Sequence, residues 1–281
     1  MTAVFQCGRF EFSLPSEPFR PIVMGILNVT PDSFSDGGKF RQLELALDHA
    51  QMMIDAGVDI IDIGGESSRP GAQPLSLQQE LDRVMPAVYA LKDCGIAISV
   101  DTYKPEVMRE VIAAGADMIN DIRGFQSPGS VAAVADSDVG LCVMHMQNTP
   151  EIMQKTPVYE DVVSEVNAFF KERVQTFVES GIALNRISLD PGFGFGKTLQ
   201  HNVELFKKIP YFIAQFDLPL LIGVSRKSMI GGLTGRSTDQ RLAGSLAGVI
   251  AGAQLGAAIV RVHDVPETID ALKVMQNLIR D

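Results

Sequence analysis

Polar residues of ligand-binding types follow most of the short apolar runs in this sequence. Eight such runs are spread along the chain, and in order they end at Asn28, Gly64, Asp101, Asp121, His145, Asp190, Ser225 and His263. When buried parallel strands close into a barrel, the residues at their carboxyl ends surround one pocket. The sequence therefore predicts a single ligand site assembled from the whole chain.

Two carboxylates, a carboxamide and an ammonium are expected at neighbouring strand ends. Asp101 and Asp190 follow the apolar runs IAISV and ISL. Asn120 and Lys227 lie at nearby ends. Carboxylates accept hydrogen bonds, an amide accepts and donates, and an ammonium donates, so the set fits a pterin or purine-like heterocycle with an amidine-like edge and a carbonyl. A structural role, with both acids paired to internal cations, is the alternative.

Cationic residues are expected near the same strand ends, although the chain has a formal net charge of −10. They are Arg69, Arg226, Lys227, Arg261 and His263. Barrel enzymes frequently bind phosphate at the loops that follow the last two strands, so these residues favour a small phosphorylated substrate. For Arg226, a surface ion pair is an equally good interpretation.

Asn28 precedes a loop that contains Asp32 and Asp36. A neutral oxygen ligand, with water and substrate phosphate completing the shell, is typical of bound Mg²⁺. Asn28 is therefore a candidate Mg²⁺ ligand, which this pattern by itself does not establish. Zinc is not expected, because the sequence has no HxH, HExxH or cysteine cluster.

The segment DPGFGFGKT, residues 190–198, differs from a phosphate-binding loop by having Pro191 in place of the first glycine. Proline lacks the N–H group and the backbone freedom of a phosphate cradle. We expect instead a glycine-rich lip whose Phe193 and Phe195 lie against a ring. His145 follows Met144 at the end of the fifth run, with no serine or cysteine nucleophile at suitable spacing.

Helical patterns alternate with the apolar runs, which predicts an α/β protein with a (β/α)8 TIM barrel. The helices are expected at 42–56, 77–92, 105–114, 129–136, 159–180, 200–215, 239–255 and 266–279. Six glycines are expected to end helices in the left-handed conformation, namely Gly57, Gly95, Gly115, Gly140, Gly181 and Gly256.

The length fits one domain over residues 1–281, with an N-terminal β-hairpin in residues 1–20 that caps the bottom of the barrel. The loops at 29–39 and 65–76 are rich in Gly, Ser and Pro, and are expected to close over the pocket.

Composition and charge exclude several classes of protein. Hydrophobic residues make up 46% of the chain, and the acidic balance argues against nucleic-acid binding. The sequence shows neither a signal peptide nor an apolar stretch of the ~18 residues needed to span a membrane. The three cysteines, Cys7, Cys94 and Cys142, stand far apart and are expected to be reduced thiols. These features predict a cytoplasmic protein without a membrane partner.

The assembled motifs resemble the dihydropteroate synthases, a pterin-binding TIM-barrel family of folate biosynthesis. The similarity covers residues 20–280 and rests on MGILNVTPDSFSDGG, GGESSRPGA, SVDTYKPEV, INDIRG, MHMQ, DPGFGFGK, GVSRKSMIG and RVHDV. It implies a transferase that joins p-aminobenzoate to 6-hydroxymethyl-7,8-dihydropterin pyrophosphate and releases pyrophosphate and 7,8-dihydropteroate. It further implies Mg²⁺ as cofactor, a homodimer, and sulfonamides as inhibitors.

The resemblance also assigns residues to three subsites. The implied pterin site contains Asp101, Asn120, Ile122, Met144, Asp190, Lys227 and Arg261. The implied pyrophosphate site contains Asn28, Ser68, Arg69, Arg261 and His263. The implied p-aminobenzoate site contains Phe34, Ser68, Arg69, Pro70, Phe195, Ser225 and Lys227. Asp101, Lys227 and Arg261 are the expected catalytic residues, and Asn28 is the expected metal ligand.

Ser68 stands where the family commonly has threonine. The hydroxyl is kept and a methyl group is lost, which is expected to alter p-aminobenzoate packing without changing the reaction.

The implied mechanism depends on departure of pyrophosphate. Cations and Mg²⁺ neutralise the leaving group, while Asp101 stabilises positive charge on the exocyclic methylene before the arylamine attacks. Two other functions share the pterin-binding residues: methyl transfer from a folate to a corrinoid or thiol, and non-catalytic pterin carriage. The cationic residues argue against methyl transfer, and pyrophosphate release tests the carrier hypothesis.

Overall fold

The computed structural model describes residues 3–14, 20–30, 39–67, 73–147 and 157–279. Its centre is a sheet of parallel strands in the order β8-β7-β6-β5-β4-β3-β10-β9. The strands are β3 (Ile22–Asn28), β4 (Ile60–Gly64), β5 (Ala97–Asp101), β6 (Met118–Asp121), β7 (Gly140–Met144), β8 (Ile187–Asp190), β9 (Leu221–Ile222) and β10 (Ile259–Val262). A bridge between Leu189 and Leu220 joins the two ends of the sheet, so the barrel closes and the predicted fold class is confirmed.

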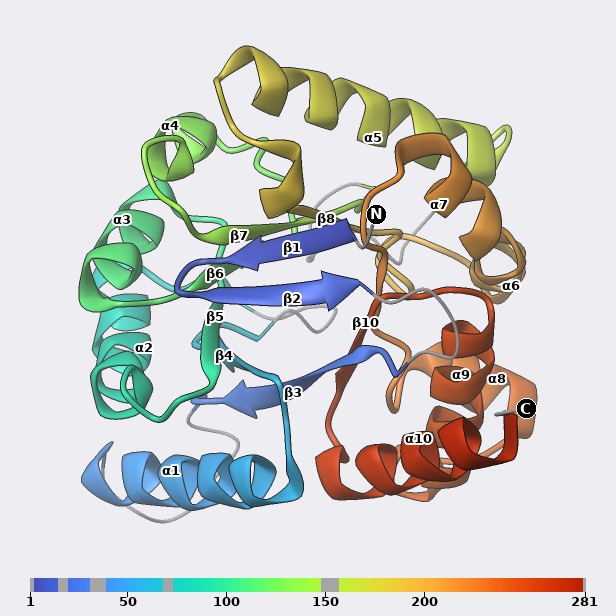
Figure 1. Cartoon of the computed structure of the whole chain (residues 1–281), viewed down its shortest axis with the longest axis horizontal. Coiled ribbons are helices and arrows are strands. Elements are labelled where there is room, and N and C mark those ends of the chain that lie inside the picture. Colours follow the sequence, from blue (N-terminus) through green and yellow to red (C-terminus); the bar gives the residue numbers. More distant parts are fainter. Residues whose placement is uncertain (1–2, 15–19, 31–38, 68–72, 148–156, 280–281) are drawn as a thin grey trace.

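Helices surround this barrel on its outside (Figure 1). They are α1 (Lys39–Ala56), α2 (Leu77–Leu91), α3 (Pro105–Ala114), α4 (Ser130–Val134), α5 (Val162–Glu179), α6 (Leu199–Lys207), α7 (Ile209–Phe216), α8 (Ser228–Thr234), α9 (Leu242–Gln254) and α10 (Val265–Ile279). In the described ranges, none of them has both the length and the apolar character of a membrane-spanning helix.

Two helical predictions were wrong in detail. The single helix expected at 200–215 is broken into α6 and α7, because Pro210 lies in the first turn of α7 and has no N–H group to continue α6. The helix expected from residue 239 begins as a 3-10 turn, Thr238–Gln240, and α9 starts only at Leu242. Helix α8, which is short and contains two glycines, was not predicted.

Side-chain caps determine where several helices begin. The Ser76 hydroxyl oxygen accepts from the Gln79 N–H, and the Gln79 side-chain oxygen accepts from the Ser76 backbone N–H. Asp161 caps α5 and Thr198 caps α6 in related ways. These bonds satisfy N–H groups that a helix start otherwise leaves without a partner.

Five of the six expected glycine caps have positive φ, between 77° at Gly181 and 108° at Gly115. The sixth expectation, Gly140, was wrong, because this residue opens strand β7 instead of capping a helix. A Cβ atom at Gly140 would lie 3.1 Å from the Gln6 carbonyl oxygen and 3.1 Å from Phe5 Cζ. A small residue is therefore required there by the close approach of the N-terminal hairpin.

The hairpin consists of β1 (Ala3–Cys7) and β2 (Phe10–Leu14), which pair in antiparallel register. It lies across the centre of the ring of strands in Figure 1. Phe5 and Cys7 are fully buried against apolar side chains from the start of the barrel strands. Arg9 Nε donates to Asp117 Oδ1 at 2.8 Å, which ties the hairpin turn to the residue that precedes β6. The hairpin thus covers the amino end of the barrel.

Side chains inside the barrel change from apolar to polar along the strands. Ala97, Ser99 and Asp101 alternate along β5 with Ile98 and Val100, which pack among the outer helices. Ala97 belongs to the apolar layer next to the hairpin, whereas the Ser99 hydroxyl is hydrogen-bonded inside the barrel. The covered amino end is therefore apolar, and the polar groups accumulate toward the carboxyl end.

Candidate active site

The parallel register brings predicted site residues next to one another at the carboxyl end of the barrel. Asn28 pairs with Gly64 across β3 and β4, and Gly64 pairs with Asp101 on β5. Asp101 in turn pairs with Asn120 on β6. On the other side of the barrel, Asp190 pairs with Met144.

Arg261 on β10 is the centre of a hydrogen-bond network inside this mouth. Its Nε donates to Asp62 Oδ2 at 2.6 Å, and a terminal nitrogen donates to Asp101 Oδ2 at 3.0 Å. Asp62 is fully buried and also accepts from Ser99 Oγ at 2.6 Å. Buried charges require such pairing, and the result is a guanidinium held in one orientation between two acids.

Asn120 is oriented by the same network. Its Nδ2 donates to Asp62 Oδ2 at 3.1 Å, so its Oδ1 is left to accept from a ligand. The floor of the site therefore presents acceptors from Asn120 and Asp101, which suits a ring edge that carries N–H donors.

Burial shifts the titration of three groups in the mouth toward neutrality. It raises the pKa of Asp101 to about 7, against the Arg261 guanidinium, which lowers it. Burial likewise raises the pKa of Asp190, where Lys227 is the main opposing charge. Burial lowers the pKa of Lys227 to about 8, while Asp190 acts to raise it. Such shifted groups, gathered in a concave site, are typical of a catalytic or binding centre.

The raised pKa of Asp101 predicts how ligand binding depends on pH. The ionised carboxylate accepts from a ring N–H and the protonated form loses that capacity, so kcat/KM for a pterin substrate is expected to rise with pH and to level off above about 7. Kinetics between pH 5.5 and 9 with the wild type and Asp101→Asn would test this expectation. The rising limb should be absent in the variant, and an identical limb in both proteins would contradict the assignment.

Apolar side chains form a wall beside these polar groups. Ile122, Met144 and Phe195 are buried together, with the partly buried Tyr103 and Met146 packed against them. We call this apolar wall, together with the polar groups of Asp101, Asn120 and Arg261, the slot. Such an arrangement suits flat heterocycles with a polar edge.

The lip predicted from DPGFGFGKT contributes to this wall through one aromatic residue, not two. Phe195 lies 4.6 Å from Lys227 Nζ, measured to the ring centroid. Phe193 instead is fully buried, with its ring 5.8 Å from that of Phe206 on α6. The expectation for Phe193 was wrong, because its ring packs with α6 in the core.

Ser225 and His263 form a pair on the side of the mouth next to β10. Ser225 Oγ lies 3.1 Å from His263 Nδ1 and accepts from the His263 backbone N–H at 3.2 Å. Burial, reinforced by the Arg261 charge, lowers the pKa of His263 to about 4. His263 is therefore neutral near pH 7 and offers a hydrogen bond rather than the positive charge expected from sequence.

Arg226 has the surface role that was the alternative for it. Its guanidinium forms an ion pair with Asp264, and its side chain is 44% exposed. Arg226 and Arg261 follow similar apolar runs, but only Arg261 enters the barrel.

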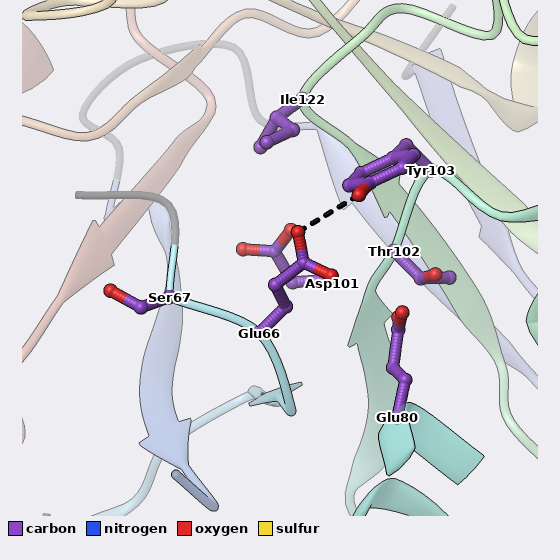
Figure 2. Close-up of a pocket in the computed structure, with 7 residues that line it drawn as sticks. All are labelled: Glu66, Ser67, Glu80, Asp101, Thr102, Tyr103 and Ile122. Atoms are coloured by element: carbon purple, nitrogen blue, oxygen red, sulfur yellow. Dashed lines mark hydrogen bonds between the residues drawn. The ribbon is translucent and has the colours of Figure 1, made fainter. Parts of the chain in front are cut away.

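A pocket beside Asp101 contains residues that sequence reasoning missed (Figure 2). Besides Asp101 and Ile122, it is lined by Glu66, Ser67, Glu80, Thr102 and Tyr103. The Tyr103 hydroxyl donates to Glu66 at 2.9 Å, and Lys104 Nζ donates to both Glu66 and Glu80. The acids of this pocket are thus paired by protein donors. Asp62 was also missed, and its position inside the apolar run DIIDIG was the available signal, because a carboxylate in a buried strand needs a buried partner.

Four predicted site residues lie outside the described residues: Phe34, Ser68, Arg69 and Pro70. The same is true of Asp32 and Asp36. In the part of the chain that the structure describes, no group of three or more His, Cys, Asp or Glu side chains is placed to hold a metal ion. Asn28 Oδ1 lies beside Gly64, where a Cβ atom would be 3.4 Å away, so the absence of a side chain at Gly64 leaves room around this oxygen for one ligand bond.

An eight-stranded parallel barrel with this slot defines a TIM-barrel protein built to bind a flat polar heterocycle. The chain belongs to the family described as pterin binding enzyme, which it matches over residues 24–263.

Relatives of this family are similar over nearly the whole chain. Dihydropteroate synthase of Escherichia coli strain K12 is 52% identical over 257 residues, which is 91% of each chain. The crystal structure of Burkholderia cenocepacia dihydropteroate synthase with 7,8-dihydropteroate has a TM-score of 0.89 and 47% identity, covering 99% of this chain and 96% of that one. The Xanthomonas albilineans enzyme with 4-aminobenzoic acid has a TM-score of 0.91 and 45% identity, covering 99% and 98%. The resemblance seen in the motifs is confirmed.

Proposed function

We propose that this chain is a transferase that joins p-aminobenzoate to 6-hydroxymethyl-7,8-dihydropterin pyrophosphate, forming 7,8-dihydropteroate and releasing pyrophosphate. The main support is the slot in which Arg261 is fixed between Asp62 and Asp101 beside the apolar wall. The relatives that are 47% and 45% identical to this chain carry 7,8-dihydropteroate and 4-aminobenzoic acid, respectively, in their structures.

The pterin is proposed to lie in the slot against Ile122 and Met144, with the Arg261 guanidinium stacked on its face. Asp101 and Asn120 Oδ1 accept from ring N–H groups, and Asp190 accepts from the opposite end of the ring. Lys227 donates to the ring carbonyl. Each role uses the hydrogen-bonding capacity that the internal network leaves free.

Carbon–oxygen cleavage is promoted by opposite charges at the two ends of the breaking bond. Asp101 favours positive charge on the exocyclic methylene, while Arg261, Ser68, Arg69 and the neutral His263 hold the pyrophosphate. Asn28 is the proposed ligand of Mg²⁺, which when bound neutralises the phosphate oxygens. No protein nucleophile takes part.

The p-aminobenzoate site is proposed at the outer side of the slot. Phe195 and Lys227 contribute one side, and Ser225 contributes a hydroxyl for the carboxylate. Phe34, Ser68, Arg69 and Pro70 complete the site in this proposal. A sulfonamide that shares the 4-aminophenyl group is expected to compete there.

Ser225→Ala is expected to raise KM for p-aminobenzoate about two- to tenfold, because one hydrogen bond contributes about 0.5–1.5 kcal/mol. KM for pterin pyrophosphate should rise less, since the Asp101 network is untouched and the Ser225 contact with His263 is the link from this hydroxyl to the pyrophosphate side. Steady-state kinetics with each substrate varied separately measures both constants. An equal rise in both would contradict the placement of Ser225.

The proposed reaction is tested by incubating the full chain with both substrates and Mg²⁺. The amount of 7,8-dihydropteroate formed, measured by chromatography, should equal the amount of pyrophosphate released. Pterin binding by calorimetry without either product would favour the carrier function instead. Omitting p-aminobenzoate separates net condensation from simple hydrolysis of the pyrophosphate.

We also propose that residues 1–281 act as one domain, that the enzyme is a homodimer, and that it works in the cytoplasm. The burial of Phe5 and Cys7 under the barrel supports a hairpin that is part of the domain. Exposed apolar side chains on outer helices, such as Leu233 and Val274, support association of two copies. Sedimentation velocity with the intact chain tests the dimer.

A further inference from the structure

The lip between β8 and α6, residues 191–197, lies with its backbone directly against the segment that follows β7. A Cβ atom on Gly192 would lie 1.9 Å from the His145 carbonyl oxygen. A Cβ on Gly196 would lie 2.6 Å from the Gln147 carbonyl oxygen. Both glycines also have positive φ. Glycine is therefore favoured at these positions by the backbone conformation as well as by the close contact. The glycines of this motif therefore serve close packing of two backbones.

Lys197 fills the space beneath this packed lip. Its Nζ donates to the carbonyl oxygens of Gly192 at 3.1 Å and Phe195 at 3.0 Å. It also lies 3.2 Å from the His145 carbonyl oxygen and 3.0 Å from His145 Nδ1. Only 3% of Lys197 is exposed, so this lysine cannot reach a phosphate group in the mouth.

His145 is suited to this contact. Burial, followed by the charge of Lys197, lowers the pKa of His145 well below its ordinary value, so the imidazole is neutral and its Nδ1 is placed to accept from Lys197 Nζ. Its ring is fixed by Phe169, at 5.0 Å between centroids and nearly perpendicular. The His145 ring that contacts Lys197 is therefore held in place by packing against Phe169.

Lys227 holds the lip through a different carbonyl. Its Nζ donates to the Phe193 carbonyl oxygen at 2.6 Å and lies over the Phe195 ring. The carbonyls of residues 192 and 195 thus bind Lys197, and the carbonyl between them binds Lys227. Movement of the lip would displace the Phe195 ring and the Lys227 ammonium together.

We propose that Lys197 is a positioning residue that holds Phe195 and Lys227 in place on the p-aminobenzoate side of the site. This inference rests on the proposed function, because it assigns a consequence to one of its substrates. Burial lowers the pKa of Lys197 to about 7, so its hold on the lip depends on the N–H groups that it directs at backbone carbonyls of the lip and of His145. Lys197, the lysine of the segment DPGFGFGKT, thus supports the site from beneath the lip and does not contact the substrate.

The test compares the wild type with Lys197→Met, which keeps the length of the side chain and removes its donors. KM for p-aminobenzoate is expected to rise roughly tenfold. KM for pterin pyrophosphate is expected to rise less, because only Lys227 links the pterin side to the lip, whereas Asp101, Asn120 and Arg261 are held by their own hydrogen bonds. Tyr159→Phe removes the hydroxyl that donates to the Gly196 carbonyl at 2.9 Å and is a milder change to the same lip. Its expected effect has the same direction and is about twofold.

Arg186→Met is the matched control. Arg186 is also a buried cation that binds backbone carbonyls, at Val134 and Val139, but it precedes β8 and so lies at the far end of that strand from the lip. This variant should unfold at a lower urea concentration than the wild type, while the KM values for both substrates stay unchanged.

The outcomes separate the two proposals. Absence of dihydropteroate synthesis by the wild type would refute the proposed function. With an active wild type, unchanged KM for p-aminobenzoate in folded Lys197→Met would overturn the role of Lys197. If Lys197→Met does not fold, an unchanged KM in Tyr159→Phe would overturn it, and a raised KM would support it. Equal KM shifts in Arg186→Met would also overturn it, because general loosening would then explain the effect.

Discussion

Asp101→Asn is expected to lower kcat/KM for pterin pyrophosphate by roughly 10²- to 10³-fold, the usual effect of removing one preorganised electrostatic group. Asparagine keeps the size of the side chain, but it removes the negative charge that faces Arg261 at 3.0 Å. Its amide also directs a donor toward the ring N–H that the carboxylate would accept. Both pterin binding and charge development on the methylene should suffer, so kcat and KM should both change.

Asp117→Asn is the matched control for this experiment. Asp117 is buried more deeply than Asp101 and is also paired with an arginine, Arg9, but it lies at the hairpin end of the barrel. We expect Asp117→Asn to unfold at lower urea while keeping kcat/KM within about twofold, because distant sites act independently. Equal affinity of wild type and Asp101→Asn for the pterin, measured by calorimetry, would refute the role of Asp101 in binding the pterin.

Arg261→Met is expected to be the most damaging single change in the site. Removing the guanidinium leaves Asp62 and Asp101 buried without their shared partner, and breaking a buried pair typically costs about 3–5 kcal/mol. The free energy of unfolding should fall by about that amount, and kcat/KM should fall roughly 10³-fold as the leaving-group cation is lost. Urea unfolding and steady-state kinetics measure the two effects.

The pH dependence of this variant has a definite direction. Arg261 lowers the pKa of Asp101 in the wild type, so its removal raises that pKa further. A proton taken up at low pH then relieves the unpaired charge, and the stability difference from wild type should narrow as pH falls from 8 to 5.5. A difference that stays constant over this range would contradict the electrostatic explanation.

Arg226→Met provides the comparison. Arg226 is 44% exposed and paired with Asp264, and such surface pairs contribute less than about 1 kcal/mol. Its loss should leave both stability and kcat/KM close to wild type. A large loss in this variant would show that burial is not what distinguishes the two arginines.

The sequence by itself determined the barrel and the location of its site. Apolar runs of strand length ending in Asp101, Asp190 and His263, separated by helical patterns, permit few other folds, because each buried strand must be covered by the helix that follows it. The helix ends at Gly57 and Gly115 were also predicted correctly, because the local preference of glycine for positive φ determines where these helices end.

The tertiary structure decided which side chains share an environment. Asp62 and Arg261 are 199 residues apart, and nothing local indicates that one orients the other. Gly140 has the same local context as a capping glycine, yet its size is required by Phe5 of the hairpin. Likewise, Lys197 is set by four acceptors below the lip instead of by the motif around it. Burial and pairing between distant segments depend on the closed barrel, whereas periodicity and turn preference act over a few residues, and only these local effects can be read along the chain.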